Sequence, residues 1–428
     1  MLFAMDKNIY QSCVRILEEE LVPAMGCTEP IAVAYAAALA RDTLGALPEA
    51  VEVAVSDSIL KNVKSVIVPN TGGMRGVPAA VAAGIAAGKA EKKLEVLSEV
   101  DDAGRRAMAA FLKERPVRVV QSDSGCVFDI GIRVRSGGDE AFVRISGHHT
   151  NVVHIERNGD VRFHKQTAQE GQEGDAAKAE ISVRDIVDFA DTVDLADVEA
   201  LLERQIAYNT AIAREGLKND YGARVGKILL QAFGDDVHNR AKATAAAGSD
   251  ARMNGCELPV VIVSGSGNQG MTASLPVVVY AEHHKIGRER MLRALVVSDL
   301  VTVHLKAGIG TLSAYCGAVS AGCGAGAGIC YLLGGGYDEV AHTVVNAVAI
   351  ESGVICDGAK SSCAAKIAAA VEAGLVGMEM TRRGSEFRGG DGILEKGVEN
   401  TIRNVSDLAR IGMRETNEEI VRLMIKTV

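Results

Sequence analysis

The segment from Ala307 to Tyr337 contains no charged residue and has ten glycines. Leu, Ile and Val are few in it, so a buried part of a globular protein explains it better than a membrane span. Small residues let backbones approach one another closely, as they must around a compact buried inorganic group. Five of the nine cysteines lie between Ala307 and Lys366, namely Cys316, Cys323, Cys330, Cys356 and Cys363. We therefore expect the rest of the chain to present a substrate to whatever these thiols hold.

The composition is that of a globular protein large enough for two or three domains. The chain has 428 residues, of which 48% are hydrophobic and 24% charged. Its net charge of −9 and the absence of a dense Lys/Arg tract argue against a nucleic-acid partner. The N-terminal residues are unlike a secretory signal because the apolar part is short and Asp6 follows, so we expect a cytoplasmic protein with no membrane partner. Thiols stay reduced there, which makes the cysteines core residues, ligands or nucleophiles rather than disulfides.

Changes in the hydrophobic period divide the chain into three parts. Residues 1–48 are helical, and we expect them to pack with the C-terminal domain. Residues 49–170 combine helices with alternating strands and hairpin turns, which indicates a small mixed or antiparallel sheet. The helical period dominates residues 171–428. The prediction is an α+β fold, with the sheet domain inserted in a large, glycine-rich, all-α domain that carries the site.

Cys27 lies immediately before a predicted helix. Thr28 is a good N-cap, Glu29 and Pro30 suit a first turn, and Ile31–Arg41 is strongly helical. The free N–H groups and the macrodipole at a helix N-terminus can lower the pKa of a thiol. On local sequence alone, a small apolar residue in a turn is the simpler interpretation of Cys27.

Two polar segments of the N-terminal half have the composition of ligand-binding loops. Asn70, Thr71 and Gly72 open a loop whose N–H groups could bind an anion, although a plain structural loop fits the spacing better. The segment His148–Glu156 contains three histidines. It has no matching Cys/His pair nearby, so a polar sheet edge that faces another domain explains it better than a zinc site.

The segment Val260–Gly270 satisfies GxGxxG after an apolar run, which is the dinucleotide-binding fingerprint. The match is weak, because Pro276 falls early in the following segment and no strand–helix alternation continues downstream. The other interpretation is a glycine loop at a helix N-terminus that binds a carboxylate, with Asn268 adding its side-chain amide.

The spacing of the cysteines excludes some metal sites and permits one. There is no CxxC pair, which argues against zinc-ribbon and thioredoxin-like motifs. Three thiolates from separate elements, such as Cys316, Cys356 and Cys363, can hold three irons of a 4Fe-4S cluster and leave the fourth open as a Lewis acid. Buried free cysteine is also among the commonest core residues, so spacing alone leaves both interpretations open.

Six motifs, spread over nearly the whole chain, are specific in combination. They are GCTEP (Gly26–Pro30), NTGG (Asn70–Gly73), SGHHTNVV (Ser146–Val153), SGSGNQG (Ser264–Gly270), KAGIGTLSAYCGAVSAG (Lys306–Gly322) and CDGAKSSCAAK (Cys356–Lys366). With them the chain resembles the L-cysteine desulfidase family, which is related to the α-subunit of iron–sulfur-dependent L-serine dehydratases. The resemblance implies that Cys316, Cys356 and Cys363 ligate a 4Fe-4S cluster and that Cys27 acts as a base. The short CDGAKSSC segment favours the desulfidase branch over the serine branch.

The resemblance further implies β-elimination on L-cysteine, giving sulfide, ammonia and pyruvate, without pyridoxal phosphate. Candidates for binding the carboxylate and amine of this small amino-acid substrate are Asn268 and the loop residues Asn70, Thr71 and Gly72. Lys306 or Lys360 could neutralise the anionic complex, or both could be solvated helix ends. Alternatives are an L-serine or L-threonine deaminase with the same cluster, a non-catalytic iron–sulfur sensor and a dinucleotide-dependent oxidoreductase. The many small-residue helices are compatible with a homodimer.

Overall fold

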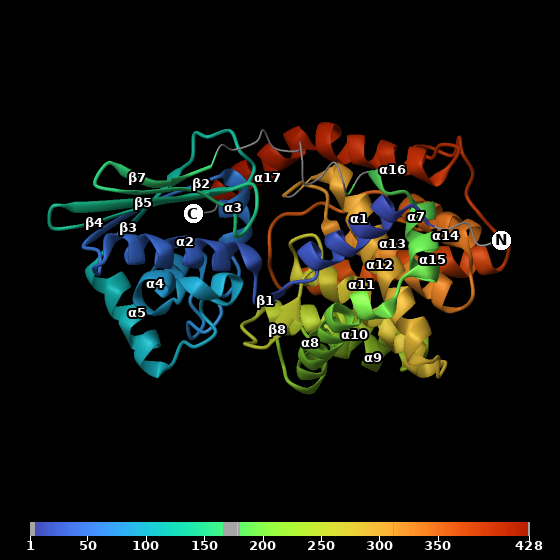
Figure 1. Cartoon of the computed structure of the whole chain (residues 1–428). Coiled ribbons are helices and arrows are strands. Elements are labelled where there is room, and N and C mark those ends of the chain that lie inside the picture. The colour runs from blue at the N-terminus through green and yellow to red at the C-terminus, as the bar shows by residue number, and fades with distance from the viewer. Residues whose placement is uncertain (1–4, 166–177, 179, 311, 427–428) are drawn as a thin grey trace.

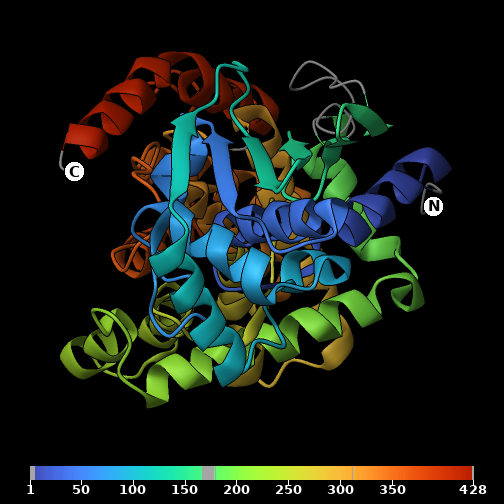
Figure 2. The same cartoon turned by 90° about the vertical axis from the view of Figure 1, so that its left-hand side faces the viewer.

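The computed structural model describes residues 5–165, 178, 180–310 and 312–426. Two parts lie side by side: one holds a sheet with its covering helices, and the other is helical (Figure 1). In the view turned by 90°, the sheet and its helices lie in front of the helical part (Figure 2). The fold is α+β, which confirms the fold class that the sequence predicts.

A sheet of six strands organises the first part, in the order β3-β2-β4-β5-β6-β7. The strands are β2 (Ala50–Val55), β3 (Val117–Gln121), β4 (Asp129–Ser136), β5 (Asp139–Ser146), β6 (Val152–Arg157) and β7 (Asp160–His164). β2 and β3 pair in parallel, and the other neighbours are antiparallel. Val51, Val53 and Val55 are buried in alternation with less buried residues, as expected of a strand with one covered face.

Helices cover that face of the sheet. The helix α2 (Thr28–Leu44) packs on β4 and β5, α4 (Gly76–Ala87) lies beside α2, and α5 (Asp102–Glu114) packs against α4. The short helix α3 (Asp57–Val63) follows β2. The sequence analysis expected residues 1–48 to pack together with the C-terminal domain. The structure divides them, since α1 (Lys7–Glu20) contacts helices of the second part and α2 lies on the sheet. Because α2 is largely buried and its run from Ile31 to Ala40 is entirely apolar, its periodicity identifies no single packing face.

The helical part surrounds α13 (Gly317–Leu332), which contacts α11, α12, α14 and α15. Its other helices are α7 (Val183–Thr192), α8 (Glu199–Lys218), α9 (Val225–Phe233), α10 (Val237–Met253), α11 (Gly267–His283), α12 (Arg288–Ile309), α14 (Tyr337–Ile350), α15 (Cys363–Arg382) and α16 (Val398–Asp407). A Cβ atom added to Gly374 of α15 would lie 2.1 Å from the carbonyl oxygen of Gly322 in α13. The uncharged, glycine-rich stretch is therefore a central helix whose neighbours cross it backbone to backbone.

Two elements join the parts. The strand β1 (Pro23–Met25), which links α1 to α2, pairs antiparallel with β8 (Pro259–Val261) of the helical part. The C-terminal helix α17 (Arg414–Lys426) runs above the molecule and ends beside α3 (Figure 1). Lys61 of α3 donates to Asn417 of α17 (2.7 Å) and to the carbonyl oxygen of Cys356 (3.3 Å), so α3 is also tied to a cysteine loop. None of the helices in the described ranges is both long and apolar enough to cross a membrane.

Asp299 of α12 makes the stability of the helical part depend on pH. It is fully buried, and burial raises the pKa of its carboxyl group to about 7, although a hydrogen bond from Gln205 of α8 (2.9 Å) opposes the shift. The folded state therefore holds a proton that the unfolded state releases near pH 4, and the free energy of unfolding falls as the pH rises from about 4 to about 7. We expect Asp299→Asn to be more stable than the wild type at about pH 8, by up to about 4 kcal/mol, and equal to it near pH 4. Urea unfolding across this range tests the prediction, and a difference that is constant with pH would contradict it.

Candidate active site

A cavity of about 120 Å³ lies between the two parts, and the predicted cysteines line it. Cys27 and Glu29 of the α2 N-terminus face it from one side, and Cys316, Cys356 and Cys363 face it from the helical part. Pockets for drug-sized ligands usually measure about 300–1,000 Å³, so this cavity suits a smaller molecule. Four cysteines from three distant segments of the sequence thus share one site.

Backbone pairing brings Cys316 and Cys356 together. The segment before α13 pairs with the segment before α15 through an antiparallel bridge between Tyr315 and Ile355. The N–H of Cys316 donates to the carbonyl oxygen of Val354 (2.8 Å), and the N–H of Cys356 donates to that of Ala314 (2.6 Å). Two thiols that are 40 residues apart therefore become neighbours.

The Cys316 and Cys356 side chains are hydrogen-bonded to each other. The Cys316 thiol donates a hydrogen bond to the Cys356 sulfur, and this bond lowers the pKa of Cys356 to about 5, with help from the positive charges of Lys61 and Lys366. The same bond raises the pKa of Cys316 well above its ordinary value. The arrangement favours the thiolate form of Cys356, which is the form that ligates metals.

Cys363 is the third cysteine of the cavity and the first residue of α15. Its sulfur is directed at the carbonyl oxygen of Gly358 (3.8 Å). Burial raises its pKa, although the backbone of Lys360 opposes the shift. Within the described ranges, no three His, Cys, Asp or Glu side chains already converge as the ligands of a single metal ion.

Cys27 is fixed by an unusual backbone position before it. Gly26 has φ +56°, in the left-handed region that favours glycine, and a Cβ atom there would lie 2.1 Å from Cγ of Pro69. This turn leads into Cys27, which is the N-cap of α2 and is 3% exposed. The sequence pattern predicts the N-cap one residue later, at Thr28, and correctly predicts that Cys27 lies at the N-terminus of a helix.

The Cys27 thiol donates to the carboxylate of Glu29 (Sγ to Oε2, 3.0 Å). Asn62 of α3 donates to the other carboxylate oxygen (3.2 Å), and the Thr28 hydroxyl lies 3.1 Å from Oε2. Burial and the negative charge of Glu29 raise the pKa of Cys27 well above its ordinary value, against a smaller effect of Arg252. The helix N-terminus was expected to lower this pKa, but desolvation and Glu29 outweigh it. Cys27 is therefore a thiol at neutral pH, with a proton acceptor in contact.

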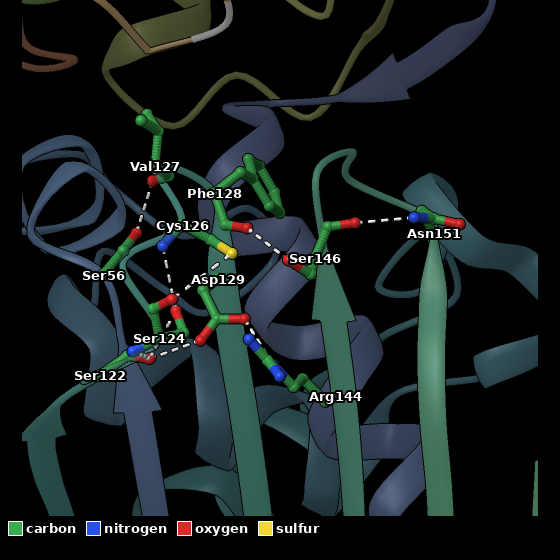
Figure 3. Close-up of polar contacts among 10 residues, drawn as sticks. All are labelled: Ser56, Ser122, Ser124, Cys126, Val127, Phe128, Asp129, Arg144, Ser146 and Asn151. Carbon is green, nitrogen blue, oxygen red and sulfur yellow. Dashed lines mark hydrogen bonds and ion pairs between the residues drawn. The ribbon is translucent and has the colours of Figure 1, made fainter. Parts of the chain in front are cut away.

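The sheet part contributes His149, which lies in the turn between β5 and β6 and lines the cavity. Figure 3 shows the polar contacts that hold this end of the sheet. The Ser146 hydroxyl donates to the carbonyl oxygen of Phe128 (3.2 Å), and Asn151 donates to that of Ser146 (2.8 Å). The Phe128 ring then packs edge-on against the His149 imidazole, with 4.8 Å between the ring centroids. Burial lowers the pKa of His149, which favours the neutral imidazole in the cavity lining.

Comparison with known proteins assigns a family to this arrangement. The family model described as serine dehydratase alpha chain matches residues 71–422. The chain belongs to the serine dehydratase alpha chain family. Cys316, Cys356 and Cys363 lie within the matched segment, and Cys27 precedes it. The relation to serine dehydratase α-subunits that the motifs predict is thus confirmed, whereas the desulfidase activity stays a prediction.

Full-length relatives extend the similarity to the segment that carries Cys27. The chain is 55% identical over 416 residues to a UPF0597 protein of Desulfitobacterium hafniense, and the match covers 97% of each chain. It is 47% identical over 422 residues to a UPF0597 protein of Lachnoclostridium phytofermentans, which covers 97% of this chain and 100% of the relative. It is 37% identical over 426 residues to a UPF0597 protein of Bacteroides fragilis, and the match covers 98% of this chain and 99% of the relative. Both parts of the fold are included in these matches.

The structure brings some of the predicted substrate-binding residues of this serine dehydratase alpha chain homologue to the cavity and not others. Asn268 and Lys306 line it. Asn70 donates instead to the carbonyl oxygen of Leu97 (2.7 Å), and Thr71 donates to that of Val68 (2.7 Å). Asn70 thus ties its loop, which also contains Gly72, to the segment at Leu97, and Thr71 bonds within the loop. Lys360 forms an ion pair with Asp357. Four predicted substrate-binding residues are therefore absent from the cavity lining: Asn70, Thr71, Gly72 and Lys360.

The glycine triplet of Val260–Gly270 does not lie in a dinucleotide-binding fold. Its preceding strand is β8, which pairs antiparallel with β1, and the six-stranded sheet is formed by other segments. Gly265 instead lies in the turn before α11, and Gly267 and Gly270 lie in the first turn of that helix. This is the context of the second interpretation, a glycine loop at a helix N-terminus that faces a ligand.

Side chains for which the sequence predicted no functional role complete the cavity. They include Glu29, Asn62, Arg252, Gln269 and Tyr315, together with His149, which the sequence suggested only as part of a zinc site. One signal was available: Ala241–Met253 is rich in small residues, as in a buried helix, and Arg252 is a cation within it. For the remaining residues only the fold shows that the side chains meet.

Gly26 allows a test of how the turn positions Cys27. We expect Gly26→Ala to lower the free energy of unfolding by roughly 2–5 kcal/mol, because a side chain at positive φ is strained and this one also collides with Pro69. Gly137→Ala is the matched control, since Gly137 has φ +58° but no atom within 4 Å of an added Cβ. Urea unfolding measures both variants. Equal destabilisation would show that the contact with Pro69 is unimportant.

Proposed function

We propose that this chain catalyses β-elimination on L-cysteine, giving sulfide, ammonia and pyruvate, with a 4Fe-4S cluster held by Cys316, Cys356 and Cys363. The observation that carries the proposal is that these three thiols and Cys27 line one small cavity in a member of the serine dehydratase alpha chain family. The short segment between Cys356 and Cys363, which favours the desulfidase branch, supports L-cysteine as the substrate.

The donor set of the cavity fits such a cluster. Iron–sulfur clusters take cysteine thiolates as ligands, and the three cysteines come from separate elements. Cys316 is the N-cap of α13, and Cys363 begins α15, so the positive ends of two helix dipoles favour an anionic group here. Thiolates that bind three different irons need not converge on one point, as the ligands of a single ion must. Gly317, Gly358 and Ala359 also line the cavity and leave room beside the thiols.

When bound, the cluster supplies a Lewis-acidic iron that stabilises the departing sulfur. The chain itself has to remove the Cα proton. The Cys27 thiol can pass its own proton to Oε2 of Glu29 and then accept the Cα proton at Sγ. Asn62 holds the other oxygen of Glu29, which fixes the direction of the carboxylate. Elimination breaks the Cα–H and Cβ–S bonds, and the aminoacrylate product tautomerises and hydrolyses to pyruvate and ammonia.

An L-serine or L-threonine deaminase is the second candidate. The family description, serine dehydratase alpha chain, favours it. The same residues would serve, because the Cα proton is equivalent and the leaving group differs. Pyruvate formed from serine, without sulfide from cysteine, would identify this activity.

The test is to purify or reconstitute the protein without oxygen and to measure iron, acid-labile sulfide and sulfide release from L-cysteine. We expect a brown protein that contains both elements and releases sulfide. A colourless protein that resists anaerobic reconstitution would refute the proposal. A loaded protein that turns over no β-substituted amino acid would indicate a sensor.

Glu29 gives a more detailed test of the proton path. We expect Glu29→Gln to lower kcat by roughly 10²-fold or more, because the amide can accept the thiol hydrogen bond but cannot take the proton. The iron content and the KM for cysteine should change little. An unchanged kcat would mean that Cys27 loses its proton to another group.

A further inference from the structure

We infer that the Arg252 guanidinium and the N-terminus of α11 form a binding site for the α-carboxylate of an amino acid. The inference deepens the proposed function and rests on it, since it names how the substrate class is recognised. It concerns a residue that the sequence analysis did not select.

Arg252 is a buried cation that forms no ion pair with any residue of the described ranges, although Glu29 lines the same cavity. It lies in the last turn of α10, lines the cavity and is 2% exposed. Its Nε has no hydrogen-bond partner, and no carboxylate forms an ion pair with it, within the part of the chain that the structure describes. A guanidinium is always charged, and a buried charge is costly unless it is paired. Its position therefore calls for an anion in the cavity.

The first turn of α11 lies beside this cation. A Cβ atom added to Gly267 would be 2.6 Å from Nε of Arg252, so the guanidinium rests against the backbone of the first helical residue. The N-cap, Ser266, makes no side-chain capping bond. The N–H groups of a first helical turn have no partner within the helix, and with the dipole they favour an anion. A helix N-terminus alone would not specify a ligand, but the unpaired guanidinium next to it does.

Two neighbouring side chains suit the other end of an amino acid. Oδ1 of Asn268 and Oε1 of Gln269 are buried without a hydrogen-bond partner, and both residues line the cavity. An ammonium group has three donors and no acceptor, so amide oxygens are suitable partners for it. The set combines a site for a carboxylate with acceptors for the adjacent ammonium group. The ligand class is therefore an α-amino acid with a free carboxylate.

This arrangement predicts which ligands are rejected. A carboxylate can accept two parallel hydrogen bonds from a guanidinium, whereas a carboxamide has one acceptor oxygen and no charge. Lysine provides a point charge without the planar fork, so it should replace Arg252 only in part.

The experiment measures binding to the cluster-loaded, full-length protein by titration calorimetry. L-Alanine is the probe, because it has the carboxylate and ammonium groups but no leaving group. L-Alaninamide is the neutral counterpart. We expect L-alanine to bind the wild type at least about 10-fold more tightly than L-alaninamide, and Arg252→Met to weaken L-alanine binding by about 10–100-fold. Arg252→Lys should give an intermediate affinity.

Arg204→Met is the matched control. Arg204 also has an Nε without a partner, but it donates to the carbonyl oxygen of Leu21 (3.1 Å) and does not line the cavity. We expect wild-type affinity for L-alanine in this variant.

Equal binding of the two probes to the wild type, or binding of neither, would overturn the inference. If Arg252→Met does not fold, the affinities of L-alanine and L-alaninamide for the wild type and for Arg252→Lys still test the inference. Arg252-dependent binding of L-alanine without sulfide release from cysteine would refute the proposed function and leave the inference standing. Sulfide release with an unchanged KM for cysteine in the Arg252 variants would refute the inference and leave the proposed function standing.

Discussion

Replacing Cys27 by alanine is expected to abolish sulfide release from L-cysteine while the iron and sulfide content stays at the wild-type level. Cys27 is the one cysteine of the cavity that contacts a carboxylate and lies outside the three predicted ligands. Loss of a general base typically costs about 10²–10⁴-fold in rate, and Cys27 is the cysteine whose thiol donates to Glu29 in the described structure. Iron analysis and a sulfide-release assay on the anaerobic protein measure the two quantities together.

Cys13→Ala is the control for removing a buried thiol. Cys13 lies in α1, is buried and is remote from the cavity lining, so turnover and iron content should both be retained. If Cys27→Ala instead loses its colour, Cys27 is a ligand and one of the three predicted ligands has another role. If the variant keeps its turnover, Glu29 or another group removes the Cα proton directly.

The sequence predicted the fold class and the position of Cys27 before a helix, because both depend on local patterns. It could not predict the pKa of Cys27. The helix N-terminus lowers a thiol pKa, but the Glu29 side chain, two residues further on, turns back onto Sγ inside a buried site. Desolvation and this negative charge raise the pKa more than the charge of Arg252 and the backbone N–H of Glu29 lower it. That outcome depends on burial and on a side-chain direction, neither of which the sequence pattern contains.

The substrate-binding residues show the same limit. The loop at Asn70 and the loop at Asn268 have similar compositions, and both were predicted to bind a ligand. The fold directs Asn70 inward to the carbonyl oxygen of Leu97, whereas Asn268 lies in the first turn of α11 and lines the cavity. Arg252 was missed because its importance comes from a missing partner, and the absence of a partner becomes visible only when the neighbours are in place.

Replacing Cys316, Cys356 or Cys363 singly by alanine is expected to remove most of the iron, the acid-labile sulfide and the turnover together. Each variant leaves two thiolates, and a cluster that already has one iron without a protein ligand would then have two. Alanine is preferred to serine because it offers no oxygen ligand. Visible absorption and iron analysis report the cluster independently of activity.

Cys323 provides the decisive control, because its distance from Cys316 in the sequence makes it a rival ligand. In the structure it is 1% exposed within α13 and does not line the cavity. Cys323→Ala should therefore keep its iron and its turnover, with at most a loss of stability from the smaller side chain. If Cys363→Ala retains its full iron content and Cys323→Ala loses it, then Cys323 is the ligand and Cys363 is not. This comparison matters most for Cys363, whose sulfur is directed at Gly358 while Cys316 and Cys356 already contact each other.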